Sequence, residues 1–171
     1  MRILLFTGDG KGKTTAALGM ALRAQGHGMR VCMIQFVKAD ADVGEVRALS
    51  QALQATIVQT GLGFLPKPTD ARWADHRAAA EAGLRQAAAA LASGPYDLVI
   101  LDEVCLAVER GLLKESDVVD AVRAAAPTLC VVLTGRGATP GLIALADTVT
   151  DMHCVKHGMQ RGIPAQKGVE R

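Results

Sequence analysis

Short apolar runs alternate along this chain with longer segments of helical periodicity. The apolar runs predict buried strands over residues 3–6, 31–37, 56–58, 97–102, 129–134 and 148–150. The longer segments predict helices over residues 14–25, 43–54, 69–92, 115–125 and 140–146. Because most of the strands are apolar at consecutive positions, they indicate a mainly parallel sheet of about six strands with helices on both faces. The sequence has no internal repeat and no linker, so we expect one α/β domain over residues 1–171.

Two segments fit neither a helix nor a strand pattern. Residues 61–68, Gly-Leu-Gly-Phe-Leu-Pro-Lys-Pro, contain too many glycines and prolines for a helix or a central strand, so a surface loop of defined shape is predicted. Asp70 is the expected N-cap of the helix that follows, and Gly94-Pro95 is its expected stop. From His153 onward, glycines and a proline predict an irregular tail.

The composition then narrows the class of protein. Half of the 171 residues are hydrophobic, only 3% are aromatic, and the formal net charge is +2. These values exclude general disorder, and neither the charge nor the aromatic content indicates a nucleic-acid partner. No apolar run approaches the roughly 20 residues of a membrane span. The apolar start at residues 1–6 is too short for a signal peptide, and the four cysteines form no CxxC, so we expect reduced thiols and a cytoplasmic location.

The strongest chemical signal lies between the first strand and the first helix, where residues 7–15 read Thr-Gly-Asp-Gly-Lys-Gly-Lys-Thr-Thr. Glycines allow successive backbone N–H groups to point at one anion, and the helix directs its positive N-terminus toward the same place. We expect Lys13 to reach the outer phosphates of a nucleotide and the Thr14 hydroxyl to bind Mg²⁺ or Mn²⁺. Thr7 stands where the standard P-loop has glycine. The predicted nucleotide-binding residues of the loop are Gly8, Asp9, Gly10, Lys11, Gly12, Lys13, Thr14 and Thr15.

A second signal is the pair Asp102-Glu103 at the end of the fourth apolar run. A carboxylate in this place can hold Mg²⁺ directly or through water, and in ATPases a glutamate here can orient a water molecule. Beside a P-loop we favour these roles over a helix cap. The two motifs predict a three-layer P-loop NTPase fold of the RecA-like kind. The candidate metal ligands are Thr14, Asp102 and Glu103, and the candidate catalytic residues are Lys13, Thr14 and Glu103.

Further motifs surround the P-loop. They are Arg23-Ala24-x-Gly26-His27-Gly28, Gln35-Phe36-x-Lys38 with Gly44-Glu45, Thr134-Gly135-Arg136, Ala146-Asp147-x-Val149-Thr150-Asp151-Met152, and the ending Lys156-His157, Gly162-Ile163, Ala165-Gln166-x-Gly168-Val169-Glu170. In this combination the chain resembles the ATP:corrinoid adenosyltransferases of cobalamin biosynthesis and salvage, over nearly its whole length. The P-loop alone is shared with many enzymes, whereas its combination with Gln-Phe-x-Lys and the ending is specific.

The resemblance implies transfer of the 5′-deoxyadenosyl group of ATP to the cobalt(I) of a reduced corrinoid, either cobalamin or a precursor, with release of triphosphate. Because the cobalt is the nucleophile, the protein needs no Ser, Cys or His for the attack. Gly8 to Thr14 would hold the triphosphate. Arg23 and Arg136 would contact the nucleotide or the corrin, although a surface salt bridge is an equally open interpretation of each. The family also implies a homodimer, and a flavoprotein reductant is an expected partner.

Two departures from the family pattern concern the corrinoid side. The loop after the third strand commonly reads Gly-Phe-Thr-Trp in the family, whereas this chain has Leu62 at the Phe position and Phe64 at the Trp position. Leu62, Phe64 and Trp73 are the candidate corrinoid contacts, with plain loop packing as the alternative for Phe64. Some relatives carry an extension before the first strand. Here the strand begins at Met1, so we expect no lid of that kind.

Two other functions stay open from the residues alone. A RecA-like ATPase or small kinase would use Glu103 to activate water or a substrate hydroxyl, and would release ADP. A non-catalytic corrinoid- or nucleotide-binding protein is suggested by the changed loop at Leu62 and Phe64. The products formed from ATP distinguish the first alternative from the transferase, and formation of a cobalt–carbon bond distinguishes the second.

Overall fold

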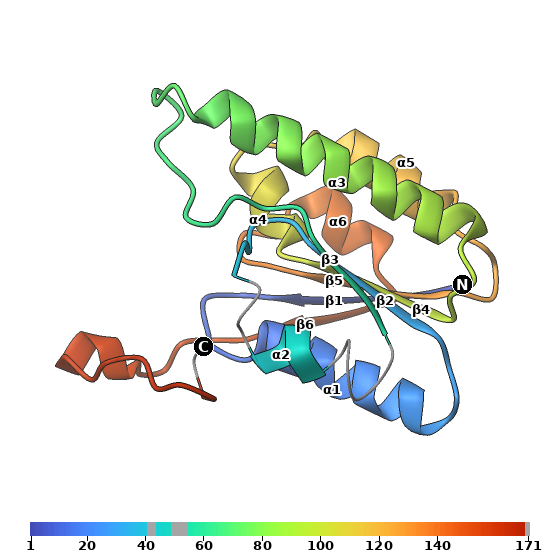
Figure 1. The fold of residues 1–171 in the computed structure, drawn as a ribbon, viewed down its shortest axis with the longest axis horizontal. Helices are drawn as coiled ribbons and strands as arrows, with labels where there is room; N and C mark the ends of the chain where they lie inside the picture. The colour runs from blue at the N-terminus through green and yellow to red at the C-terminus, as the bar shows by residue number, and fades with distance from the viewer. Residues whose placement is uncertain (41–43, 49–54, 170–171) are drawn as a thin grey trace.

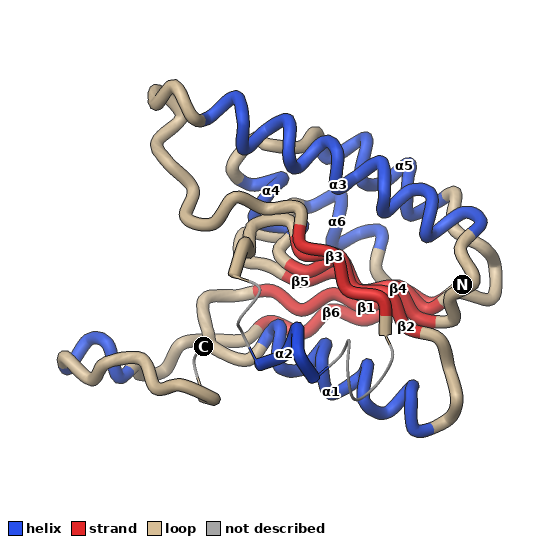
Figure 2. The backbone as a smooth tube through the Cα atoms, in the orientation of Figure 1, coloured by secondary structure: helices blue, strands red, loops and turns tan. Residues whose placement is uncertain are grey.

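The computed structural model describes residues 1–40, 44–48 and 55–169, and within these ranges a six-stranded sheet forms the centre (Figures 1 and 2). The strand order is β3-β2-β4-β5-β1-β6, and all the pairings are parallel. The predicted parallel α/β sheet is therefore confirmed. The strands are β1 (Arg2–Thr7), β2 (Val31–Gln35), β3 (Thr56–Gln59), β4 (Leu98–Asp102), β5 (Cys130–Thr134) and β6 (Thr148–Asp151).

Helices cover both faces of this sheet, as Figure 1 shows. One face carries α1 (Lys13–Gly26), with α2 (Gly44–Arg47) on the same side. The other face carries α3 (Trp73–Ser93), α4 (Val104–Glu109), α5 (Glu115–Arg123) and α6 (Pro140–Leu145). The C-terminal segment contains a 3₁₀ turn, η2 (Gly158–Arg161), and extends away from the sheet. In the described part of the chain, no helix is both long enough and apolar enough to cross a membrane.

Successive strand residues point to two separate hydrophobic cores. On β2, Val31 and Met33 join the core beneath α1, whereas Cys32 and Ile34 join the core beneath α3 to α6. The helix side of the first core consists of alanines, which allow α1 to lie close to the sheet; they are Ala17, Ala21 and Ala24. Because both faces of the central strands β2, β4 and β5 are buried, their apolar runs were continuous in the sequence.

Two local expectations differ from the structure, and a third is tested only in part. The third predicted helix begins at Trp73 rather than near residue 69, and Asp70 is not its N-cap. The Asp70 carboxylate instead accepts hydrogen bonds from the backbone N–H and the guanidinium of Arg72, which lower the pKa of Asp70 to about 2. The predicted strand over residues 31–37 ends at Gln35. Of the predicted helix 43–54, residues 44–47 form α2, and residues 43 and 49–54 lie outside the described ranges.

Candidate active site

The P-loop contains glycines because another segment of backbone lies directly against it. Gly8 has a φ of +93°, which residues with a side chain rarely adopt. A Cβ atom on Gly8 would also collide with the carboxylate of Asp151 and the backbone of Met152. The N–H of Gly10 donates to the carbonyl oxygen of Met152 across 2.6 Å. The loop between β1 and α1 is therefore packed against the chain that leaves β6, at the carboxyl edge of the sheet.

Lys13, the first residue of α1, points back into this loop. Its Nζ donates to the carbonyl oxygens of Gly8, at 2.7 Å, and Gly10, at 2.6 Å. The residue is only 7% exposed. Burial lowers the pKa of Lys13, and the carboxylate of Glu103 opposes that effect. The ammonium group is thus held by two carbonyl dipoles at the place where a phosphate group would supply full negative charge.

Asp102 is the centre of the polar network at the end of β4. Its carboxylate is completely buried. Oδ1 accepts from the hydroxyls of Thr14, at 2.8 Å, and Thr134, at 2.7 Å, whereas Oδ2 accepts from the amide of Gln35, at 3.0 Å. Gln35 lies opposite Asp102 in the register of β2 and β4. This carboxylate therefore ties the first turn of α1 to the ends of three strands.

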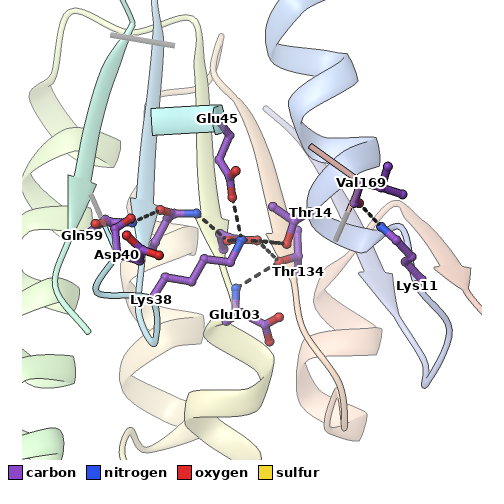
Figure 3. Close-up of polar contacts among 11 residues, drawn as sticks. Lys11, Thr14, Lys38, Asp40, Glu45, Gln59, Glu103, Thr134 and Val169 are labelled. Carbon is purple, nitrogen blue, oxygen red and sulfur yellow. Dashed lines mark hydrogen bonds and ion pairs between the residues drawn. The ribbon is translucent and has the colours of Figure 1, made fainter. Parts of the chain in front are cut away.

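Lys38 provides the positive charge beside Asp102, and Figure 3 shows its side chain reaching toward Glu45. Its Nζ lies 3.3 Å from Asp102 Oδ2 and 3.2 Å from Glu45 Oε1. Burial by itself would lower the pKa of Lys38, but the carboxylates of Asp102 and Glu45 outweigh it and hold the pKa above its ordinary value. Lys38 is therefore a protonated ammonium group between two acidic side chains.

Glu103 has the most strained backbone in the site. Its φ is +62°, and it is the one non-glycine residue with positive φ in the described part of the chain. The backbone N–H donates to the Thr134 hydroxyl at 3.0 Å. Its Oε2 is buried and, among the described residues, has no hydrogen-bond partner. Burial, followed by the charge of Asp102, raises the pKa of Glu103. A strained residue with an unsatisfied buried oxygen is typical of a functional site.

These groups fit a divalent cation. Mg²⁺ and Mn²⁺ prefer oxygen ligands, and the site provides the Thr14 hydroxyl and the carboxylates of Asp102 and Glu103. The unsatisfied Oε2 of Glu103 is the observation that favours such a ligand, because a cation would satisfy an oxygen that the described protein groups do not.

Two cavities meet at this edge of the sheet. The first has a volume of about 630 Å³ and is lined by residues 9–15 together with groups from the C-terminal segment, such as Val169. The second has a volume of about 860 Å³ and lies against residues 63–68, with a mainly apolar lining. Lys38 and Glu103 line both cavities. Two ligands bound there would therefore face each other across these two side chains.

The structure brings most of the predicted nucleotide-binding residues together. Residues 9–15 and Arg136 line the first cavity. Lys11 also donates to the carbonyl oxygen of Val169 at 2.8 Å (Figure 3). Arg23 is exposed and is not among the lining residues of either cavity. It lies ten residues after Lys13 on α1, which corresponds to about 15 Å along the helix axis.

The predicted corrinoid contacts divide between the second cavity and its surroundings. Phe64 and Trp73 line that cavity, whereas Leu62 is exposed and does not. Phe64 is 102% exposed, so it adds no packing against the described residues. Trp73 packs partly against the hydrophobic core. The alternative of plain loop packing for Phe64 therefore finds no support in the structure.

Several residues of the site were not predicted as site residues. Gln35, Lys38, Glu45 and Thr134 occurred in the quoted motifs without an assigned role, and α4 contributes Leu106 and Arg110 to the second cavity. The available signal was a polar residue directly after an apolar run, as at Gln35 and Thr134. Helix α4 was missed because its apolar residues 104–108 follow the strand of Asp102 almost without a break.

The comparison with protein families agrees with this geometry. Residues 1–171 match the family described as ATP:corrinoid adenosyltransferase BtuR/CobO/CobP. The chain belongs to this family. The family resemblance inferred from the motifs is thereby confirmed, and the chain is an ATP-dependent corrinoid adenosyltransferase.

Curated relatives carry the same description. The corrinoid adenosyltransferase of Pseudomonas aeruginosa is 43% identical over 171 residues, which cover 98% of this chain and 82% of the relative. The corrinoid adenosyltransferase CobA of Salmonella typhimurium is 37% identical over 169 residues, which cover 98% of this chain and 84% of the relative. The corrinoid adenosyltransferase of Escherichia coli K12 is similar to the same extent, at 37% identity.

A solved structure supports the fold. The flagellar accessory protein FlaH from Methanocaldococcus jannaschii aligns with a TM-score of 0.58, over 87% of this chain and 69% of its own. The sequence identity is 12%, so this likeness concerns the fold alone. The predicted three-layer P-loop fold of the RecA-like kind is confirmed.

Proposed function

We propose that this chain transfers the 5′-deoxyadenosyl group of ATP to the cobalt(I) of a reduced corrinoid, and that the two cavities bind the two substrates. The observation that best supports this proposal is that Lys38 and Glu103 line both the P-loop cavity and the mainly apolar cavity. Both volumes, about 630 and 860 Å³, are in the range of substrate sites. The ribose end of the nucleotide would lie at the shared wall, opposite the corrin face.

The reaction requires no nucleophile from the protein. Cobalt(I) attacks C5′ of the ribose, a cobalt–carbon bond forms, and the bond between C5′ and the triphosphate oxygen breaks. The electron pair of that bond leaves with triphosphate, and the cobalt becomes formally cobalt(III). The tasks of the chain are to orient the substrates, neutralise the leaving group and exclude water.

On the nucleotide side, the backbone of residues 8–14 and the side chain of Lys13 would hold the triphosphate. Lys13 would exchange the carbonyl oxygens of Gly8 and Gly10, its present acceptors, for phosphate oxygens. Arg136, which lines the same cavity, would add a second cation. These charges act on the group that becomes more negative as the C5′–O bond breaks, so they lower the barrier rather than only the KM.

The metal site of this proposal consists of Thr14, Glu103 and, through water, Asp102. Mg²⁺ bound there would neutralise part of the triphosphate charge. The buried carboxylate of Asp102 orients the Thr14 hydroxyl, and the raised pKa of Glu103 reflects burial that a cation would compensate. A requirement for Mg²⁺ or Mn²⁺ is tested by dialysis against EDTA followed by titration of each metal.

On the corrinoid side, Phe64 and Trp73 are the aromatic groups available to a planar ring. Phe64 extends from its loop without any contact to the core, and the apolar lining of its cavity continues to Leu65 and Leu106. A corrin face placed on Phe64 would bury its apolar surface and help to exclude water from the cobalt. Leu62, at the edge of the loop, would have a minor part.

One anaerobic reaction tests the function. Reduced cobalamin, MgATP and the protein are mixed, and the absorption spectrum is followed for the adenosylated product while phosphate products are separated by anion exchange. We expect adenosylcobalamin and triphosphate in equal amounts. ADP and phosphate in place of triphosphate would indicate the ATPase or kinase alternative, which the family match does not favour. Corrinoid binding without a cobalt–carbon bond would indicate a carrier.

Four further expectations belong to the same proposal. The chain would form one domain and act as a homodimer, which light scattering after gel filtration measures. A flavoprotein would supply the electron to cobalt, and the enzyme would work in the cytoplasm. The cysteines support a cytoplasmic location, because all four are free thiols and disulfides are rare in the cytoplasm.

A further inference from the structure

The ammonium group of Lys38 lies among oxygens that the proposed function assigns to the divalent cation. Its Nζ is 3.3 Å from Asp102 Oδ2 and 3.5 Å from Thr14 Oγ1. A third contact, 3.2 Å to Glu45 Oε1, holds it from the side of α2 (Figure 3). One positive group therefore already occupies the place in which a second is expected to bind.

An ammonium group and a divalent cation compete for these oxygens. Nζ lies 3.5 Å from Thr14 Oγ1 and 3.3 Å from Asp102 Oδ2, so a cation that used both oxygens would have to take up the space that Nζ occupies beside them. The positive charges of the ammonium group and the cation would also repel each other. Binding of the cation therefore requires the Lys38 side chain to move.

We propose that Lys38 is a resident counter-cation, which neutralises the acidic residues of the metal site in the nucleotide-free protein and is displaced by the divalent cation that binds with ATP. Its neighbours support this role, because Asp102 is completely buried and Glu103 has an unsatisfied carboxylate oxygen among the described residues. Lys38 forms the ion pairs with Asp102 and Glu45, so without it these two carboxylates would lose the charge that neutralises them directly.

The displaced side chain has a defined direction to take. Lys38 lines both cavities, so its ammonium can turn along the shared wall toward the second one. There it would donate hydrogen bonds to the polar edge of the second substrate. Cation binding at the P-loop would thereby bring the Lys38 ammonium into the second cavity as a hydrogen-bond donor. The identity of that substrate rests on the proposed function, whereas the displacement depends only on the metal.

The test uses Mn²⁺ alone, with neither ATP nor corrinoid, and follows the electron paramagnetic resonance signal of the free ion. Lys38→Met is expected to bind Mn²⁺ at least about tenfold more tightly than the wild type, because the competing charge is gone. Lys38→Arg keeps the charge and should retain the weak binding of the wild type. Lys114→Met removes a lysine from the groove between α3 and α5 and controls for net charge.

Equal Mn²⁺ affinities of Lys38→Met and the wild type would overturn the proposal. An equal gain in Lys38→Arg or Lys114→Met would overturn it too, because the effect would then not come from this charge. Thermal unfolding monitored by circular dichroism establishes that each variant is folded.

A second measurement uses the wild type and is independent of how the variants fold. Lysine side chains are labelled with ¹³C at Cε, and the Lys38 resonance is assigned through its contacts with neighbouring protons. Adding Mg²⁺ to the ATP-bound protein should shift this resonance and leave that of Lys114 in place. An unmoved Lys38 resonance would overturn the displacement. Both measurements omit the corrinoid, so a failure to form adenosylcobalamin would refute the proposed function separately.

Discussion

Thr14 donates its hydroxyl hydrogen to Oδ1 of Asp102 across 2.8 Å, although 88 positions of the sequence separate the two residues. The bond joins the P-loop helix α1 to the carboxyl end of β4. The same oxygen accepts from Thr134 at the end of β5, the strand that lies between β4 and β1 in the sheet. The phosphate loop and the acidic strand end, two separate motifs in the sequence, are thus parts of one hydrogen-bonded network.

This network predicts unequal losses of stability for two substitutions. Asp102→Asn removes a buried charge that faces the Lys38 ammonium and turns amide hydrogens toward donors, so the free energy of unfolding should fall by about 3 kcal/mol. Thr14→Val removes one donor among several and should cost about 1 kcal/mol. Urea unfolding without metal measures both. Asp97→Asn, at an exposed ion pair with Arg30, is the matched control and should change little. Equal losses at Asp97 and Asp102 would contradict the expectation.

Lys13 supplies the second prediction. Lys13→Ala should reduce adenosyl transfer by at least about 100-fold, because the group that stabilises the departing triphosphate is lost. The fold should persist, since the hydrogen bonds that the Lys13 ammonium donates to described residues go to carbonyl oxygens of its own loop. Initial rates with reduced cobalamin and the thermal unfolding midpoint measure the two effects. Lys11→Ala, whose ammonium contacts the exposed Val169 carbonyl, should lose less activity. Normal turnover in Lys13→Ala would contradict the assignment of the P-loop.

Substitutions of the two aromatic residues of the second cavity should affect corrinoid binding and protein stability to different extents. Phe64→Ala should leave the free energy of unfolding within about 0.5 kcal/mol of the wild-type value, because Phe64 is fully exposed among the described residues. Trp73→Ala should lower it by about 2 kcal/mol, because Trp73 packs partly against the core. Phe64→Ala should nevertheless weaken corrinoid binding by about tenfold, as expected for the loss of one aromatic contact. Unchanged corrinoid KM and unchanged reduction of cob(II)alamin would show that Phe64 has no part in the site.

Much of this architecture was predictable because its causes are local. A strand buried on both faces must be apolar at consecutive positions, and a P-loop must place glycines and a lysine between a strand and a helix. The sheet was therefore predicted correctly, and residues 9–15 line one cavity, as the P-loop pattern led us to expect. Local pattern gave no means of separating α4 from β4, since apolar residues continue from Leu98 to Val108 with only Asp102 and Glu103 between them.

The role of Lys38 illustrates what the sequence does not contain. Its motif places it two residues after Phe36, but its contact with Asp102 requires β2 and β4 to be neighbours in the sheet. Strand order depends on the whole chain, so it cannot be predicted from a stretch of ten residues. The same limit applies to Arg23, which lies in a family motif but on an exposed turn of α1 outside both cavities.

Buried thiols predict how stability depends on alkaline pH. Burial raises the pKa of Cys105 from 9.0 to about 12. The unfolded chain therefore loses this proton from about pH 9 upward while the folded chain keeps it, so ionisation favours unfolding. The contribution of the neutral thiol to the free energy of unfolding has its full value below pH 9. It is lost as the pH rises toward 12. Between these values the wild type should lose about 1.4 kcal/mol per pH unit more than Cys105→Ala. Urea unfolding at several pH values under reducing conditions measures this slope, and Cys154→Ala, which removes an exposed thiol, should follow the wild type. Parallel profiles for Cys105→Ala and the wild type would show that Cys105 ionises equally in both states.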